Sequence, residues 1–152
     1  SGISIVYVGA ATQVEMIEKK HRIEDALEAV TSAQIGGVHA GGGVPLLRAA
    51  SKIKTPAHLN EEQLLGFKTV LKAANEPIRQ MAINAGASPD IVVNLVKDEN
   101  DNIGYNFVTS KMVDMVKVGI IDPVRVTCCA LKNAVSVSST LITTNHAIVE
   151  EK

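Results

Sequence analysis

The chain has 152 residues, a length typical of one domain, and 46% of them are hydrophobic, which is enough for a substantial core. Aromatic residues make up only 3% and tryptophan is absent, so we expect the core to be aliphatic. The formal net charge is −1, which argues against a protein that binds nucleic acid or an acidic membrane surface.

The first predicted element is a strand over residues 3–9, where β-branched and apolar residues alternate. A long helix is predicted over residues 13–34, with Thr12 and Glu15 at the spacing of a capping box, and it ends at Gly36 and Gly37. Its many charges indicate a lever or connecting element rather than a core helix.

A lone strand cannot satisfy its own backbone groups. We therefore expect the strand over residues 3–9 to pair with residues 147–149, with another chain, or with a part of the protein outside this sequence.

Helical spacing, N-cap residues and proline positions predict four further helices, over residues 44–52, 61–75, 77–85 and 88–96. The rest of the chain is predicted as a polar turn over 97–104, an extended piece over 105–108, a short helix over 111–118, a tight connection over 120–123, a long helix over 123–142 and an extended end over 143–150.

The two cysteines, Cys128 and Cys129, are adjacent and would close a strained ring, so we expect free thiols in a core or groove and a reducing compartment. Nothing has the form of a signal peptide or a membrane-spanning helix, and we expect a cytoplasmic protein. The four histidines are far apart in sequence, so no metal site is predicted within the chain.

The glycine run (residues 41–43) precedes an apolar helix and can be a hinge, a place of close packing, or a backbone that a ligand approaches. It lacks the ending of a phosphate-binding P-loop and the spacing of a dinucleotide fingerprint, so local chemistry favours the first two. Local chemistry also makes Asp25 a solvated helix carboxylate, Asn106 a turn residue and Asp122 an N-cap before Pro123.

Four stretches taken together are far more specific: VGAATQVEMIEKKHRIEDALEAV, AGGGVPLLRAAS, GYN and GIIDPVRVT, in this order. They resemble the C-terminal part of the group I chaperonins of the GroEL type, over essentially the whole chain. The resemblance implies a mainly α, multihelical fold with a long intermediate-domain helix and a few short strands. Residues 1–36 would end the intermediate domain, and residues 37–152 would form the C-terminal half of the equatorial ATP-binding domain.

In that family the intact protein hydrolyses ATP, with Mg²⁺ and K⁺, to assist the folding of other proteins in a homo-oligomer of two seven-subunit rings. The resemblance implies that a GroES-type cochaperonin and unfolded substrate proteins bind an apical domain outside this chain. The phosphate-binding loop and the magnesium carboxylate would also lie outside it. We therefore expect the isolated chain to be inactive as an ATPase.

The resemblance also implies roles for single residues. Asp25, in the stretch RIEDAL, would be the catalytic aspartate that moves onto the nucleotide and helps to activate the attacking water. Gly42 would approach the ribose and base, and Asp122 would accept hydrogen bonds from the ribose hydroxyls. Ile120 would contact the adenine, and Asn106 would lie at its edge. Gly36 and Gly37 would be the hinge between the two domains.

Some residues depart from the family pattern. Phe107 and Val108 stand where two small residues are usual; we expect both at the base, with Phe107 stacking on it or narrowing its pocket. His39 and the cysteine pair are also unusual. Phe107, Val108 and the cysteine pair favour the alternative, a non-catalytic helical interaction module derived from a chaperonin. Since the family's C-terminal strand pairs with a neighbouring subunit, an unpaired edge at residues 147–149 would associate with itself or with residues 3–8.

Overall fold

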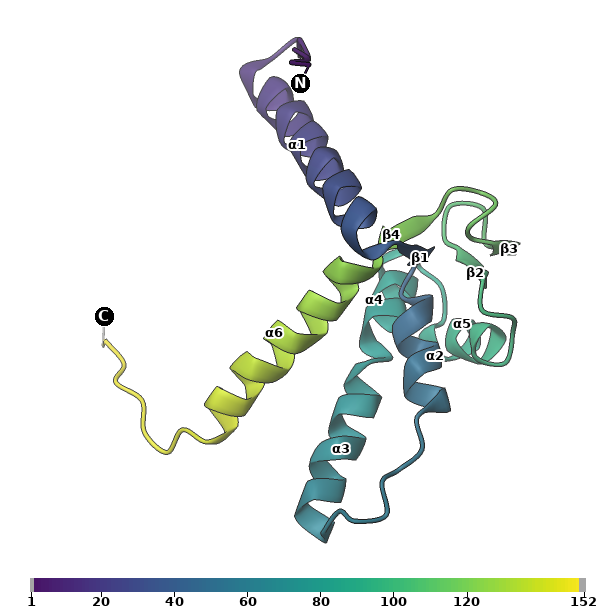
Figure 1. Ribbon diagram of the computed structural model, residues 1–152, viewed down its shortest axis with the longest axis vertical. Helices are drawn as coiled ribbons and strands as arrows, with labels where there is room; N and C mark the ends of the chain where they lie inside the picture. Colours follow the sequence, from purple (N-terminus) through teal and green to yellow (C-terminus); the bar gives the residue numbers. More distant parts are fainter. Residues whose placement is uncertain (1, 151–152) are drawn as a thin grey trace.

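A computed structural model describes residues 2–150, which form six helices and two antiparallel two-stranded ribbons (Figure 1). The helices are α1 (Gln13–Gly36), α2 (Val44–Lys52), α3 (Glu61–Ala73), α4 (Glu76–Asn84), α5 (Pro89–Lys97) and α6 (Val124–Ile142). The strands are β1 (Val38–Ala40) and β4 (Ile121–Pro123), which pair, and β2 (Ile103–Asn106) and β3 (Lys111–Asp114), which also pair. The expected mainly α fold with a few short strands is confirmed.

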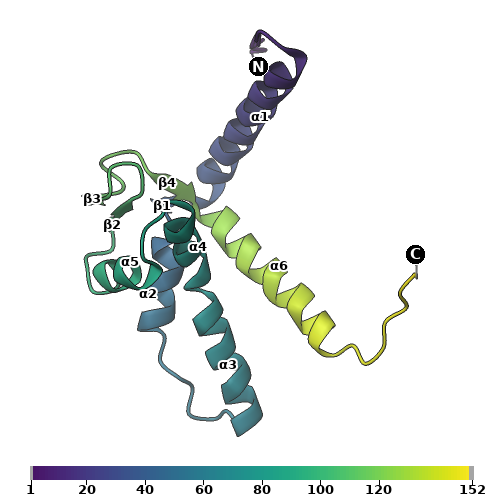
Figure 2. The same ribbon diagram turned by 180° about the vertical axis from the view of Figure 1, so that it is seen from behind.

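The body of the molecule consists of α2, α4, α5 and the two ribbons, and the helices α1, α3 and α6 project from it in different directions (Figures 1 and 2). The core lies in this body and is aliphatic, as expected: Val44, Leu47, Ile78, Ala82, Val92 and Val96. The three projecting helices contribute no buried residue. The charged helix α1 is therefore an arm and not a core helix.

Local signals mark most of the helix ends correctly. Thr12 Oγ1 accepts a hydrogen bond from the N–H of Glu15 at the start of α1. Asn60 and Gln63 exchange both bonds of a capping box at the start of α3. Gly37 ends α1 with φ at 75°, a left-handed conformation that favours glycine. These ends depend on neighbours within a few residues.

The predicted helix over residues 111–118 is wrong, because Lys111–Asp114 form strand β3 against β2. Ser110, with φ at 54°, closes the preceding turn. Asp114 Oδ1 then accepts the N–H of Lys117 at 3.1 Å and bends the chain into a turn as soon as the strand ends. The ribbon and this turn use the backbone groups that a helix would have needed.

The predicted strand over residues 3–9 is also wrong, since Gly2–Thr12 contain no strand, and Ile3 and Tyr7 are 92% and 91% exposed. The extended end over 143–150 forms no strand either, and Ile148 is fully exposed. The segments 3–9 and 143–150 lie far apart in both views (Figures 1 and 2), and they do not pair with each other. Pairing with another chain stays a prediction.

Candidate functional site

The glycine run lies where the β1–β4 ribbon meets α2. His39 stands opposite Asp122 in the ribbon, and Gly41 continues the ladder by donating its N–H to Ile120 O at 2.9 Å. A Cβ on Gly41 would lie 3.2 Å from Ile120 Cγ2 and 3.3 Å from Asp122 Oδ2. Glycine at this position therefore allows the Asp122 carboxylate to lie over the backbone.

Gly42 and Gly43 both have left-handed backbone, with φ at 71° and 74°. A Cβ on Gly42 would lie 2.9 Å from Met115 Cε, and one on Gly43 would lie 3.0 Å from the backbone nitrogen of Ile78. Each glycine of the run thus packs against a different element: β4, the turn after β3, and α4. The structure shows the close packing that local chemistry favoured.

Ile120 and Asp122 border Gly41 from the other side of the ribbon. Ile120 is half-buried, and its N–H donates to Met115 O at 2.8 Å. Asp122 is exposed, and its expected role as an N-cap is wrong, because Pro123 is the N-cap of α6 and no side chain caps this helix. The Asp122 carboxylate is therefore not used by the helix it precedes. We call Gly41, Gly42, Ile120 and Asp122 the glycine wall.

Asn106, Phe107 and Val108 lie on the neighbouring ribbon. Asn106 Oδ1 accepts the N–H groups of Val108 at 2.9 Å and Thr109 at 3.3 Å, so it is a turn residue. The Phe107 ring packs against the core and meets Tyr105 edge to face, with centroids 5.1 Å apart. Val108 is 93% exposed and is the apolar side chain that this turn presents outward.

Asp25 lies apart from all of these residues. It is exposed on α1, the arm that projects from the body (Figure 1). Among the described residues it forms no ion pair, whereas the nearby Glu24 pairs with Lys20, and Glu18 with Arg22. The structure therefore brings Ile120 and Asp122 together at Gly41, the neighbour of Gly42, whereas Asp25 lies on the projecting arm.

Two residues with roles at the wall have no sequence motif. His39 Nδ1 lies 2.9 Å from Ala40 O, which can only accept, so Nδ1 carries the proton and Nε2 accepts from the Thr127 hydroxyl at 3.0 Å. This side chain fastens β1 to the first turn of α6. Met115 is 1% exposed, and its Cε packs against Gly42. Its burial follows from packing between distant segments, which no local pattern reveals.

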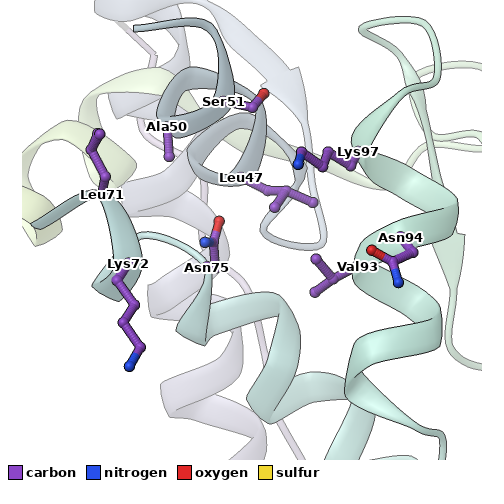
Figure 3. Close-up of a pocket in the computed structure, with 9 residues that line it drawn as sticks. All are labelled: Leu47, Ala50, Ser51, Leu71, Lys72, Asn75, Val93, Asn94 and Lys97. Atoms are coloured by element: carbon purple, nitrogen blue, oxygen red, sulfur yellow. The ribbon is translucent and has the colours of Figure 1, made fainter. Parts of the chain in front are cut away.

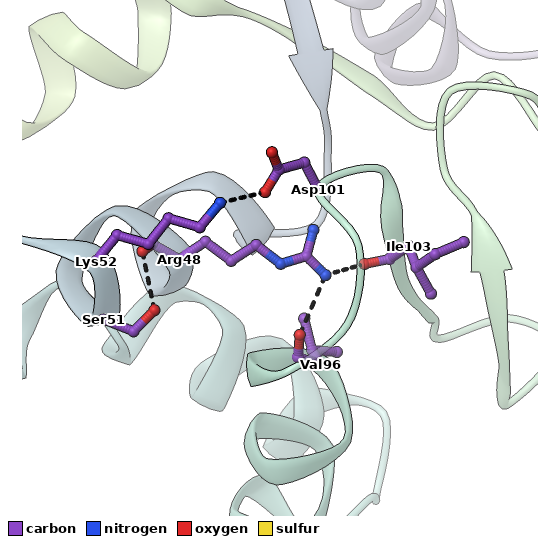
Figure 4. A network of polar contacts seen from close by, with 6 residues as sticks. All are labelled: Arg48, Ser51, Lys52, Val96, Asp101 and Ile103. Atoms are coloured by element: carbon purple, nitrogen blue, oxygen red, sulfur yellow. Dashed lines mark hydrogen bonds and ion pairs between the residues drawn. The ribbon is translucent and has the colours of Figure 1, made fainter.

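Arg48 holds the helix that follows the glycine run (Figure 4). It is 4% exposed, and its Nη2 donates to Val96 O at 3.1 Å and to Ile103 O at 2.6 Å, which ties α2 to α5 and β2. Burial lowers the pKa of Arg48, and the nearby carboxylate of Asp101 partly opposes this. Lys52 donates to Asp101 at 2.5 Å and lowers the pKa of that carboxyl.

Two hollows lie away from the wall. One, of about 330 Å³, is lined by residues of α2, α3 and α5 that include Leu47, Lys72 and Lys97 (Figure 3). The other is a groove of about 740 Å³ between α3 and α6. None of the site residues predicted from sequence lines either hollow. Cys128 and Cys129 are free, as expected, but both are exposed and line neither hollow, so their expected position in a core or groove is wrong.

The fold is thus a helical body with a packed glycine wall and a long exposed arm. At the wall, the carboxylate of Asp122 caps no helix. The family model of the TCP-1/cpn60 chaperonin family matches residues 1–152, the whole of the sequence. The chain belongs to this family. Chaperonins assist the folding of other proteins, work as oligomeric assemblies and are in general ATPases. None of the helices in residues 2–150 has the length and hydrophobicity needed to cross a membrane.

Proposed function

We propose that the glycine wall binds the ribose and base of ATP in a group I chaperonin. The observation that carries this proposal is the position of Asp122, whose carboxylate lies over the Cβ-free backbone of Gly41 and caps no helix. A free carboxylate accepts hydrogen bonds from two neighbouring hydroxyl groups, as a ribose presents them. Gly42 and Ile120 offer backbone and an apolar surface beside it.

The neighbouring ribbon supplies the edge of the base site in this proposal. Both lone pairs of Asn106 Oδ1 are used within the turn, so its side-chain NH₂ group is free to donate. Val108 is exposed and offers the apolar contact to the base. Phe107 packs against the core, and in this proposal it narrows the base pocket.

Asp25 would act as the catalytic carboxylate that helps to activate the attacking water. Its support is the form of the arm: a 24-residue helix without a buried residue, which ends at Gly37 in left-handed conformation. Asp25 lies eleven residues before Gly36, roughly 16 Å along the helix. Because Asp25 lies this far from the hinge, a rotation of α1 at the hinge would displace its carboxylate relative to the wall. Residues 1–36 would belong to the intermediate domain and residues 37–152 to the equatorial domain.

The residues at the wall fit the sugar and base of a nucleotide. The only carboxylate of the wall, that of Asp122, is assigned to the ribose and is therefore not assigned to a metal ion. In the proposal, groups outside this chain hold the phosphates, Mg²⁺ and K⁺. An apical domain outside this chain would bind unfolded proteins and a GroES-type cochaperonin. The assembly would be two seven-subunit rings in the cytoplasm, and the isolated chain would not hydrolyse ATP.

The test of the wall is Asp122→Ala in the full-length protein. Loss of the ribose contacts would raise KM for ATP about tenfold, because one charge-assisted hydrogen bond contributes about 1.5–3 kcal/mol. Steady-state hydrolysis at varied ATP measures this. An unchanged KM would remove Asp122 from its assigned role. Asp90→Ala, which removes an exposed carboxylate of α5 that pairs with Arg79, is the matched control and should leave KM unchanged.

The second candidate is a non-catalytic helical interaction module, and the α3–α6 groove is the observation that favours it. Mostly apolar and small residues line this groove, among them Leu46, Leu65, Leu131 and Ile142. The upstream reading frame discriminates the two candidates. A Gly-Asp-Gly-Thr-Thr stretch there supports the ATPase, and its absence supports the module.

A further inference from the structure

Met115 lies in the turn between β3 and β4 and is 1% exposed. Its side chain fills the space between two glycines of different elements, Gly42 in the glycine run and Gly104 in β2. A Cβ on Gly104 would lie 2.8 Å from Met115 Cγ and 3.1 Å from Sδ, and one on Gly42 would lie 2.9 Å from Cε. The middle of this unbranched side chain therefore touches one glycine, and its tip touches the other.

The main chain of Met115 holds the opposite side of the wall. Its N–H donates to Asn102 O at 2.8 Å, and its carbonyl accepts the N–H of Ile120 at 2.8 Å. Ile120 O in turn accepts the N–H of Gly41 at 2.9 Å. The contacts form a closed circuit from Gly42 through Met115 and Ile120 back to Gly41, the neighbour of Gly42.

We propose that Met115 is a positioning residue for the nucleotide. Its side chain fixes the position of the Gly42 backbone, its carbonyl fixes the position of Ile120, and it does not touch the nucleotide itself. This inference rests on the proposed function of the glycine wall. It predicts an effect on nucleotide affinity and not on the hydrolytic step, because the proposed catalytic residue, Asp25, lies on α1 and not in the turn that carries Met115.

The first test is Met115→Ala in the assembled full-length protein, with ATP hydrolysis measured over a range of ATP concentrations. We expect KM to rise about tenfold and kcat to stay within about twofold, since a cavity behind Gly42 lets the wall relax. Val92→Ala is the matched control. Val92 is 2% exposed in the same core but lies on α5, away from the wall, so its loss should not change KM.

The second test is Met115→Leu, which still tests the proposal if the alanine variant does not assemble. Leucine keeps most of the buried volume, but it is shorter and branched and cannot reach both glycines. We expect the protein to assemble normally and KM to rise about threefold. Gly42→Ala should also raise KM less in the Met115→Ala background than in the wild type, since the contact with Cε is then gone.

The proposal is overturned if Met115→Ala changes KM no more than Val92→Ala does, or if Met115→Leu equals the wild type. A failure of the proposed function looks different. In that case the wild type does not hydrolyse ATP, or Asp122→Ala leaves KM unchanged, and the inference on Met115 falls with it. If Asp122→Ala raises KM and the Met115 variants do not, the wall stands and only the role of Met115 is refuted.

Discussion

The glycine wall and the α1 arm are joined through Gly37 and strand β1, but they differ in how their residues are held. In the glycine run, which supplies the wall residues Gly41 and Gly42, each of residues 41–43 packs against a separate element, so its atoms are fixed from several directions. The arm has no buried residue and is stabilised by contacts within the helix, such as the pairs Lys20–Glu24 and Arg22–Glu18. The wall glycines are therefore held by tertiary packing, whereas the exposed Asp25 carboxylate lies on a helix whose ion pairs are local.

The largest expected effect concerns the arm. Asp25→Ala in the full-length protein should lower kcat for ATP hydrolysis by about 10²–10⁴-fold, the usual contribution of a general base, with little change in KM. Steady-state hydrolysis measures both constants. Glu24→Ala is the matched control, because this neighbouring carboxylate is paired with Lys20 and should be dispensable. Hydrolysis that survives Asp25→Ala unchanged would contradict the catalytic role of the arm.

The next effect is structural and concerns Gly43, the residue of the glycine run that follows the wall residues Gly41 and Gly42. Gly43→Ala should lower the free energy of unfolding by about 2–4 kcal/mol, because alanine is strained at φ 74° and its Cβ would lie 3.0 Å from the backbone of Ile78. Urea denaturation of the chain measures it.

Gly66→Ala in α3 is the control for Gly43→Ala. Nothing lies within 4 Å of its added Cβ, and this exchange in a helix should stabilise by about 1 kcal/mol. Equal stability of the two variants would mean that the glycine run is not held by packing.

A smaller effect is expected at the start of the arm. Thr12→Ala removes the side-chain bond to the N–H of Glu15 and should cost about 1 kcal/mol of helix stability. Because α1 contributes nothing to the core, the loss should appear as faster hydrogen exchange in the first turn of α1 and not in α2 or α4. Exchange that rises equally in the body would contradict the separation of arm and wall.

The smallest effect is a pH dependence at the β2–β3 ribbon. The backbone N–H of Lys117 lowers the pKa of Asp114 below its usual 3.8. A lowered folded-state pKa means that the stabilisation is present above the usual value and is lost as the pH falls through the folded value. Asp114→Asn should therefore flatten the acid limb of stability. Acid titration of unfolding checks this, and an unchanged limb would contradict it.

The sequence predicted all six helices, and several of their ends, within a few residues. Thr12, the Asn60–Gln63 box and the prolines near the starts of α2, α4 and α5 act on backbone groups only a few positions away. The resemblance to chaperonins also came from contiguous stretches, and the family match over residues 1–152 bears it out. Such information is local, so it can be read without knowing where distant segments lie.

Strand pairing and the arrangement of the wall could not be predicted in the same way. Residues 111–114 have no local feature that excludes a helix; they are a strand because β2 lies beside them. The strand expected at residues 3–9 failed for the converse reason, since no partner strand lies beside it within residues 2–150.

Which residues build the wall depends on the same kind of distant contact. Met115 carried no motif, yet it joins Gly42 and Gly104, which are far apart along the chain. Helix caps are satisfied within one turn of the chain. Ribbons and packed glycines need atoms from remote segments, and these come together only in the folded molecule.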